Sequence, residues 1–432
     1  MSVTLSVIVL VLLLLLLLFA GVHVAFALGI VGFVGAVFLL PGSTQNMMGK
    51  LGFSAINKFP LTPVPMFILM GELLVYARMN ENLYGTLSVW LRNVRGGLCH
   101  ATTASCAIFA AMSGSSLATS ATLGLIAGPE MIKRGYSRSL TYGTIAAGGT
   151  LGILIPPSIT MIVYGNLAGV SIGHCFVAGV IPGIICAAMF IVLVDIWGRL
   201  SPKSMPMPER SAMRLGDKLV ATFRLIPAAA LIFMVLGGIY LGVTTPTEAG
   251  AVGAFGALIL CLMQRTLTWS NLWKALLSAV RTTSFIMIIL AGASMVSFVV
   301  QYLRVPSMLT DFVIQLEASP YLVMAFFYLL YIILGMFVDP ISMMVMTVPT
   351  ILPTVVQLGF DPIWFAVVIT LACEIGLISP PVGLNLYILQ GISDCTLAEV
   401  AIGAAPFLFA LIFGLALFTA FPILSLWLPS LM

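Results

Sequence analysis

Two double prolines inside apolar segments are the most informative residues of this chain. Gly152-Ile153-Leu154-Ile155-Pro156-Pro157 recurs as Gly376-Leu377-Ile378-Ser379-Pro380-Pro381, at an offset of 224 residues (376 − 152). Each proline removes a backbone donor and clashes with the preceding helical turn, so a double proline in an apolar run is costly. The same cost at a constant offset indicates two copies of one unit, each with a broken helix. In membrane proteins this pattern marks the site where a transporter binds its cargo.

A broken helix offers backbone groups that can bind ions of either sign. Carbonyl oxygens freed after Gly152 and Gly376 are hard ligands suited to a small cation. The half-helices that begin near Ser158 and Gly383 present amide groups and the positive end of a helix dipole to an anion. Non-helical backbone at membrane depth persists only where it is buried in protein or lines a cavity. One broken element can therefore supply both a sodium site and an anion site.

Hydroxyl, amide and carboxylate side chains accompany both breaks. Near the first they belong to a Ser-Gly turn, and near the second to an Asp-Pro turn and to Asn385. Small residues also permit close helix packing in membranes, but their position beside a duplicated proline break favours a functional interpretation. The side chains expected to contact the substrate are Ser115, Ser116, Ser158, Asp339 and Asn385. Further hydroxyls belong to Ser113, Thr119 and Ser342, and weaker candidates are Thr160 and Asn166.

Two intramembrane acids, Asp339 and Glu374, lie closest to the breaks. An ionisable residue within a span is a functional hypothesis by default, and each of these could ligate sodium or titrate in a proton-coupled cycle. The first copy has Ser115 and Thr150 at the corresponding positions, so the acids are not a symmetric ligand pair. Two other acids are assigned structural roles in the helix scaffold, Glu72 and Glu248.

The composition identifies the class of protein. Of the 432 residues, 61% are hydrophobic and only 7% are charged, and the mean hydropathy is +1.18. A soluble domain carries about 25% charged residues, so this chain is expected to be an all-α, polytopic membrane protein. It has room for about ten crossings of roughly 20 residues. The seven cysteines form no CxxC pair and only three histidines occur, so no zinc, haem or iron–sulfur cofactor is expected.

The offset of 224 extends beyond the prolines. Pro129 matches Pro353 and Gly135 matches Gly359, and ordered matches at one offset indicate a duplication. The predicted parts are a first repeat over residues 1–197, a linker over 198–224 and a second repeat over 225–432. Basic residues in a short loop favour the cytoplasmic side, and the linker contains six of them: Arg199, Lys203, Arg210, Arg214, Lys218 and Arg224.

Each repeat is predicted to contain a re-entrant hairpin and a broken helix. The hairpins are expected over 98–131 and 321–356, and the broken helices around 152–158 and 376–383. Basic residues flank the first hairpin, whereas acidic residues flank the second and no Lys or Arg follows Arg304. Because Lys and Arg favour the cytoplasm, the hairpins are expected to begin at opposite faces, which makes the repeat inverted in topology. Lys50 and Lys58 fall on the predicted outer side, against this bias.

Counting outwards from the hairpins predicts ten crossings. In the first copy they lie near 5–20, 21–40, 62–77, 139–164 and 176–197. In the second they lie near 225–243, 245–263, 280–302, 363–388 and 400–425. The apolar run over 5–40 could instead form one long tilted helix.

Four ordered motifs, spread over essentially the whole chain, resemble the large membrane subunit (DctM-like) of tripartite ATP-independent periplasmic (TRAP) transporters. They are AMSGSS at 111–116, the segment 149–158, TPTEAG at 245–250 and EIGLISPPVGLN at 374–385. The resemblance implies a secondary transporter of the bacterial inner membrane with an elevator-type fold, in which a domain with the two hairpins slides against a fixed scaffold. It implies sodium as the coupling ion, no other cofactor, and a small carboxylate substrate that is an organic or sugar acid. The implied partners are a small four-helix membrane subunit, a periplasmic substrate-binding protein and membrane lipid.

The resemblance also implies two sodium sites. One comprises Gly335, Gly376, Ser379 and Val382. The other comprises Ser113 with Gly149, Gly152 and Pro156. Ser379 stands where family members often have Thr, which keeps the hydroxyl, and His23 stands where they commonly have Pro in the scaffold. The Asp339-Pro340 turn and Asn385 are closer to the dicarboxylate and sugar-acid branches than to the sialic-acid ones.

Other classes of protein fit the sequence less well. The nearest alternative is a sodium- or proton-coupled anion symporter or antiporter of related inverted-repeat fold that needs no binding protein. An enzyme would need convergent nucleophile, base or metal ligands; His100 and His174 show no such spacing, so no catalytic residue is assigned. A channel also has broken helices, but two opposed hairpins favour gating on alternate sides. The chain has no GxxxxGK[ST] loop, which argues against a nucleotide-driven pump, and no nucleic-acid partner is expected.

Overall fold

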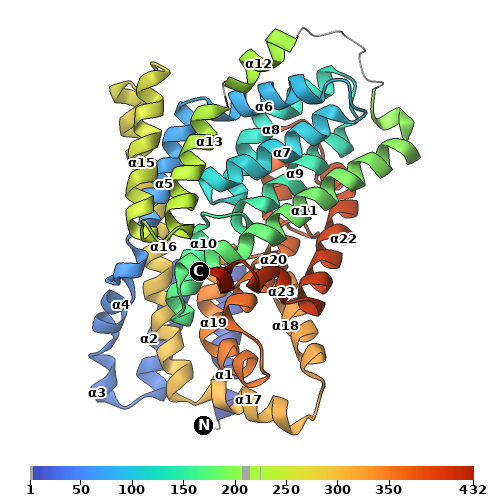
Figure 1. The fold of residues 1–432 in the computed structure, drawn as a ribbon. Helices are drawn as coiled ribbons and strands as arrows, with labels where there is room; N and C mark the ends of the chain where they lie inside the picture. Colours follow the sequence, from blue (N-terminus) through green and yellow to red (C-terminus); the bar gives the residue numbers. More distant parts are fainter. Residues whose placement is uncertain (1–2, 207–214, 224) are drawn as a thin grey trace.

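The structure is a computed structural model that describes residues 3–206, 215–223 and 225–432. Every secondary-structure element within these residues is a helix, as the sequence predicts. The predicted linker over 198–224 lies only partly within the described residues, because positions 207–214 and 224 fall outside them. In Figure 1 many helices run between the lower and the upper end of the molecule. The N-terminus lies at the lower end, and α12, the last helix of the linker, lies at the upper end.

The elements of the first half are α1 (Val3–Phe19), α2 (Val24–Leu39), α3 (Gly42–Gln45), α4 (Met48–Ile56), η1 (Phe59–Leu61), α5 (Pro63–Tyr76), α6 (Met79–Leu91), α7 (Gly97–Ser113), α8 (Ser116–Lys133), α9 (Arg138–Leu154), α10 (Ile159–Ala168) and α11 (Ile172–Leu200). The elements that follow are η2 (Pro202–Ser204), α12 (Leu215–Phe223), α13 (Ile226–Ile232), the π-helix η3 (Phe233–Gly237), α14 (Gly238–Tyr240), α15 (Pro246–Met263), α16 (Trp269–Tyr302), α17 (Val305–Gln315), α18 (Pro320–Gly335), α19 (Pro340–Gln357), α20 (Pro362–Leu377), α21 (Leu384–Ile392), α22 (Leu397–Ala420), α23 (Ile423–Leu426) and η4 (Pro429–Leu431).

The outer surface of the helices is apolar. Eight helical segments of the described residues are long and apolar enough to cross a membrane. Large apolar side chains on the outside of the bundle include Phe33 on α2, Phe255 on α15 and Phe413 on α22, each more than half exposed. A soluble protein of this size would bury such side chains, whereas lipid solvates them. The chain is therefore a multi-pass membrane protein.

The run over 5–40 forms two helices, so the alternative of one long helix is wrong. Gly21 separates α1 from α2 with φ of +79°, a backbone conformation that glycine adopts without the strain other residues incur. The second helix, α2, packs along α16, and a Cβ on Gly32 would lie 2.5 Å from the Cβ of Met295. This contact joins the first helices of the chain to the long helix of the second half.

Two acids assigned to the scaffold do make structural contacts. Glu248 completes a capping box with Thr245 at the start of α15, an arrangement that satisfies two free backbone amides. Glu72 on α5 accepts a hydrogen bond of 2.6 Å from Ser278 Oγ on α16. Together with α2, these helices form a packed group that we refer to as the scaffold (α2, α5, α15 and α16).

Both double prolines break their helices. The chain leaves α9 at Leu154 and enters α10 at Ile159, and it leaves α20 at Leu377 and enters α21 at Leu384. In both places the peptide bond between the two prolines is cis. The interior of both long apolar segments is thus non-helical at the same relative position.

The two hairpins lie at opposite ends of the molecule. The first, α7–α8, occupies the upper part of Figure 1, and the second, α18–α19, occupies the lower part. Their tips, at Gly114 and at Asp339, both point toward the middle of the bundle, where the helix breaks lie. The repeat is therefore inverted in topology, as predicted from the distribution of basic residues.

Several elements differ from the predicted spans. Amphipathic helices α6 and α17 connect the scaffold to the hairpins, and each follows an arginine with positive φ, Arg78 and Arg304. The predicted crossing over 280–302 begins earlier, because α16 is one helix of 34 residues. Its counterpart in the first half is interrupted into α4, η1 and α5, where Pro60 and Pro63 remove backbone donors.

Candidate functional site

The tip of the first hairpin packs directly on the first break. Gly114 has φ of +63°, and a Cβ there would lie 2.6 Å from the carbonyl oxygen of Pro157. A Cβ on Gly152 would lie 2.7 Å from backbone atoms of Ser115 and Ser116. Only glycine permits such close backbone approach. The break and the tip therefore form one continuous surface of backbone atoms.

Hydroxyl groups line the inner side of this contact. Ser113 is buried, and its Oγ lies 3.1 Å from Thr119 Oγ1, which also donates to the carbonyl oxygen of Ser115 at 2.8 Å. Gly149 lies one turn before the break, and a Cβ on it would overlap Ser120 Oγ at 1.8 Å. Gly152 and Pro156 are buried near the same tip. The predicted sodium-ligand residues of the first repeat thus surround one tip.

The second hairpin meets the second break through backbone atoms as well. A Cβ on Gly376 would lie 2.6 Å from Cα of Gly335, so the two helices touch at these glycines. The amide of Gly383 donates to the carbonyl oxygen of Met336 at 3.1 Å and ties the break to the tip. Ser379 donates its hydroxyl to the carbonyl oxygen of Ile375 at 2.6 Å. Val382 is partly buried beside Gly383.

Asp339 and Ser115 perform the same structural task in the two copies. Ser115 is the N-cap of α8 and accepts from the amide of Ala118 at 3.4 Å. Asp339 is the N-cap of α19 and accepts from the amide of Ser342 at 3.0 Å and from the Ser342 hydroxyl. Both side chains satisfy free amides at a helix start. The acid and the serine are therefore equivalent as caps, although not as charges.

A central cavity of about 150 Å³ lies between the two tips. The predicted substrate contacts Ser115, Ser116 and Asp339 line it, and so does the weaker candidate Thr160. The first residues of α8, α10 and α19 belong to its wall, so three helix N-termini converge on it. No lysine, arginine or histidine occurs among the described residues that line it.

Two predicted substrate contacts lie outside this cavity. Ser158 is fully buried and caps α10 by accepting from the amide of Met161 at 3.3 Å. Asn385 is also fully buried, and neither polar atom of its side chain has a hydrogen-bond partner among the described residues. The structure brings Ser115, Ser116 and Asp339 together at the cavity, and it leaves Ser158 and Asn385 buried outside its lining.

Glu374 connects the two halves of the molecule. It is fully buried in α20, and its Oε1 accepts a hydrogen bond from Ser116 Oγ at the tip of the first hairpin. The other oxygen, Oε2, is buried and makes no well-formed hydrogen bond within the described residues. Ser116 therefore both lines the cavity and holds an acid from the other repeat. The sequence singled out Glu374, but not this pairing.

The scaffold supplies one wall of the cavity that sequence reasoning missed. Thr282, Phe285 and Ile286 of α16 line it. The sequence signal there is the polar stretch Arg281-Thr282-Thr283-Ser284 before the apolar part of α16, and such a stretch is too common in membrane proteins to identify a site.

An all-helical membrane protein with two opposed hairpins, whose tips close a cavity at two broken helices, has the architecture of a secondary transporter. The chain belongs to the family described as "Tripartite ATP-independent periplasmic transporter, DctM component", which matches residues 10–424. It is thus the large permease component of a TRAP transporter, which confirms the resemblance seen in its motifs.

Curated relatives span the length of the chain. It is 34% identical over 405 residues to the C4-dicarboxylate TRAP transporter large permease protein DctM of Pseudomonas aeruginosa, covering 94% of each chain. It is 31% identical over 416 residues to the sialic acid TRAP transporter large permease protein SiaM of Vibrio cholerae, covering 96% of each. Among solved structures, the YdaH transporter of Alcanivorax borkumensis superposes with a TM-score of 0.63 over 91% of this chain and 90% of that one, at 12% identity. That last likeness shows a common fold.

Proposed function

We propose that this permease carries out sodium-coupled uptake of a small carboxylate, an organic or sugar acid, across the bacterial inner membrane. The observation that supports it best is the convergence of three helix N-termini, with serine hydroxyls, on a cavity without a basic residue in its described lining. Each N-terminus carries roughly half a positive charge. Together they can hold a carboxylate without an arginine among the described lining residues.

Sodium completes this electrostatic arrangement. Asp339 places a carboxyl group at the cavity wall, and an ionised carboxylate there opposes an anionic substrate unless a cation binds nearby. Freed carbonyl oxygens at the breaks and the hydroxyls of Ser113 and Ser379 are hard ligands suited to sodium. Two sodium sites, at Ser113 with Gly149, Gly152 and Pro156, and at Gly335 with Gly376, Ser379 and Val382, would place positive charge beside the cavity.

The way in which the lining residues of the central cavity are divided between the scaffold and the rest of the molecule supports an elevator movement. Hairpin tips and broken helices supply most of its lining, and only Thr282, Phe285 and Ile286 belong to the scaffold. A substrate held mainly by one body can travel with that body past an apolar wall. The moving body in this proposal comprises the two hairpins and the two broken helices, and α16 is the surface along which they slide.

The proposed partners follow from the family. We propose that a periplasmic binding protein delivers the substrate and that a small four-helix membrane subunit joins the scaffold. Curated relatives are named for C4-dicarboxylates and for 2,3-diketo-L-gulonate, among others, which supports an organic or sugar acid. The linker over 198–224 is proposed to lie in the cytoplasm because of its basic residues.

The proposal is tested by the melting temperature of the purified protein in sodium and in potassium. A ligand that binds only the folded state raises its stability by mass action. We expect a rise specific to sodium that shrinks in Ser379→Ala, followed by uptake that requires a sodium gradient and the binding protein. Identical melting curves in both salts would contradict sodium coupling and favour proton coupling through Asp339 or Glu374. Uptake that proceeds without any binding protein would contradict the tripartite arrangement.

A further inference from the structure

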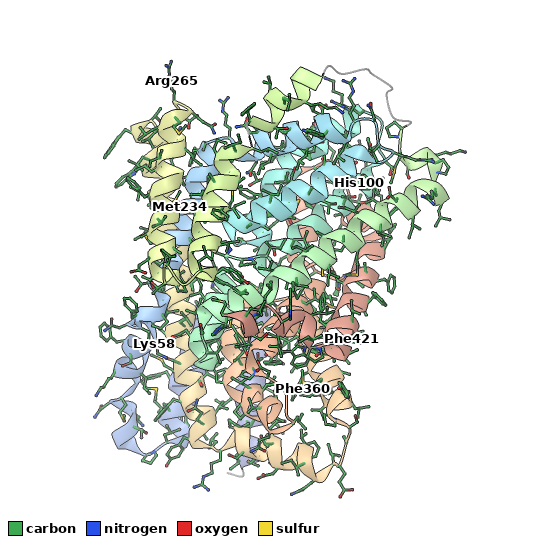
Figure 2. The ribbon with its side chains drawn as sticks, in the orientation of Figure 1. Lys58, His100, Met234, Arg265, Phe360 and Phe421 are labelled. Carbon is green, nitrogen blue, oxygen red and sulfur yellow. The ribbon has the colours of Figure 1, made fainter. Side chains whose placement is uncertain are left out.

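A second cavity, which we name the Lys58 cavity, lies between the scaffold and the proposed moving body. Its volume is about 260 Å³. Its walls come from the scaffold helix α16 and from α4, which packs on α16, on one side, and from α10 and α19 on the other. Its polar lining consists of Lys58, Asn166, Ser294, Ser297 and Gln301. Figure 2 shows Lys58 well below Arg265 and His100, which lie toward the end that carries α12.

Lys58 is available to a ligand. Its side chain is exposed, and it has no acidic partner within the described part of the chain. It follows the end of α4 in extended backbone, at the point where the scaffold counterpart of α16 is interrupted. An ammonium group without an acidic partner among the described residues, beside a polar cavity, offers an anion a positive charge to bind.

The rest of the polar lining supplies hydrogen bonds. Gln301 donates to Ser297 Oγ at 3.1 Å, which orients both groups along α16. Asn166 lies opposite, near the end of α10. One ammonium, two amides and two hydroxyls around a small volume match the needs of a carboxylate, which accepts several hydrogen bonds and is stabilised by a nearby cation.

The position of the Lys58 cavity is consistent with substrate binding at two sites, one after the other. Ser294 and Ser297 lie 12 and 15 residues beyond Thr282, which lines the central cavity, on the same helix α16. At 1.5 Å per residue this places the Lys58 cavity about 20 Å farther along the scaffold. We propose that the Lys58 cavity binds the carboxylate of the substrate on the extracytoplasmic side, before the central cavity receives it. This inference rests on the proposed function.

The first experiment is independent of transport and uses charged thiol reagents on the full chain. Ser297→Cys introduces a thiol in the cavity, whereas the seven native cysteines are buried. The new thiol is reacted with anionic 2-sulfonatoethyl methanethiosulfonate and, separately, with cationic 2-(trimethylammonium)ethyl methanethiosulfonate. The ratio of the first reaction rate to the second measures the local electrostatic potential. We expect Lys58→Gln to lower this ratio roughly fivefold, as one partly screened charge would. Lys50→Gln is the matched control, because Lys50 is exposed on α4, the helix that precedes Lys58, but does not line the cavity.

An unchanged ratio in Lys58→Gln, or an equal fall in Lys50→Gln, would overturn the inference. If Ser297→Cys fails to fold, Ser294→Cys probes the same cavity.

The second experiment measures succinate uptake by the complete transporter in proteoliposomes. We expect Lys58→Gln to raise KM about fivefold with little change in maximal rate, and Lys58→Arg to restore it. Uptake with an unchanged KM overturns this inference alone. If the wild type takes up no carboxylate, the proposed function fails, and the reagent ratio still decides whether the cavity attracts anions.

Discussion

The two broken helices share a sequence pattern but differ in their surroundings. Pro156 and Pro157 are buried, whereas Pro380 and Pro381 are exposed. The first break is covered by the tip of its hairpin through backbone contacts on both sides of the prolines. The second is tied to its hairpin by one glycine contact and by the hydrogen bond from Gly383 to Met336. A duplication therefore need not produce two equal sites.

The starts of the following half-helices differ in the same sense. Ser158 caps α10 with its side chain, and it is fully buried. Gly383 begins α21 without a side-chain cap and with φ of +62°. The first break thus has a satisfied and enclosed helix start, whereas the second leaves its helix start to backbone contacts alone. We therefore expect the first break to be the more rigid one, and the second, where Pro380 and Pro381 are exposed, to be the more accessible to an ion.

The largest expected effect comes from filling the glycine contacts. Gly152→Val should destabilise the fold by about 3 kcal/mol and abolish uptake, because its Cβ meets backbone atoms of a buried tip. Gly376→Val should also abolish uptake by blocking the proposed second ion site. Its fall in melting temperature should be smaller, since the break that follows α20 is exposed at Pro380 and Pro381 and leaves this end of the helix room to shift. Thermal melting of both purified variants measures the difference. Gly85→Val, where nothing lies within 4 Å of the new Cβ, is the control. An equal fall in melting temperature in the two variants would contradict the proposed difference between the breaks.

A second prediction concerns the contact between Ser116 and Glu374, which joins the first tip to the helix before the second break. Ser116→Ala leaves a buried carboxyl group without its donor, at a cost of about 1–3 kcal/mol. Glu374→Gln should be milder, because the amide oxygen can still accept. The double variant should be less destabilised than the sum of the two single changes, since the residues act as a pair. Additive shifts in melting temperature would show that the pair is not coupled.

The smallest expected effect on stability separates the two serines of the breaks. Ser158→Ala should cost about 1 kcal/mol through loss of a helix cap. Ser379→Ala should cost less, because its hydroxyl bonds only to a carbonyl one turn earlier, yet it should raise the sodium concentration needed for half-maximal uptake. Melting and sodium titration of both variants give the comparison. A sodium dependence changed by Ser158→Ala alone would reverse the roles assigned to the two breaks.

The features that could be predicted from the sequence are those that rest on local chemistry. The double prolines located both helix breaks, because a missing backbone donor acts wherever the chain folds. The imbalance of basic residues predicted the opposed hairpins, which Figure 1 shows at opposite ends. Ser115, Ser116 and Asp339 were expected at the substrate site, and all three line the central cavity. The contacts of these residues with substrate, and the sodium sites, remain predictions.

The features that escaped prediction depend on packing between distant segments. Ser158 and Asn385 are fully buried and do not line the central cavity, whereas Ile159 and Thr160, the first residues of α10, do. The wall formed by Phe285 exists because α16 lies against the cavity between the hairpin tips, a long-range contact that no local sequence pattern predicts. Ser115 and Asp339 both cap the helix that follows them. This shared role was not predicted, because the two residues were compared only by their charge. Helices α6 and α17 are short and amphipathic, so a prediction based on hydropathy does not identify them.

The length of α16 has a consequence for the surrounding lipid. At 34 residues it is about 51 Å long, whereas the hydrocarbon layer is about 30 Å thick. Its apolar part over 282–302 matches that thickness, and its first turns carry the exposed side chains of Trp269, Trp273 and Lys274, which favour the headgroup region. Anchored in this way, α16 would respond to a thinner or thicker bilayer by changing its tilt rather than its depth. Acyl-chain length should therefore set the angle of the wall against which the central cavity closes.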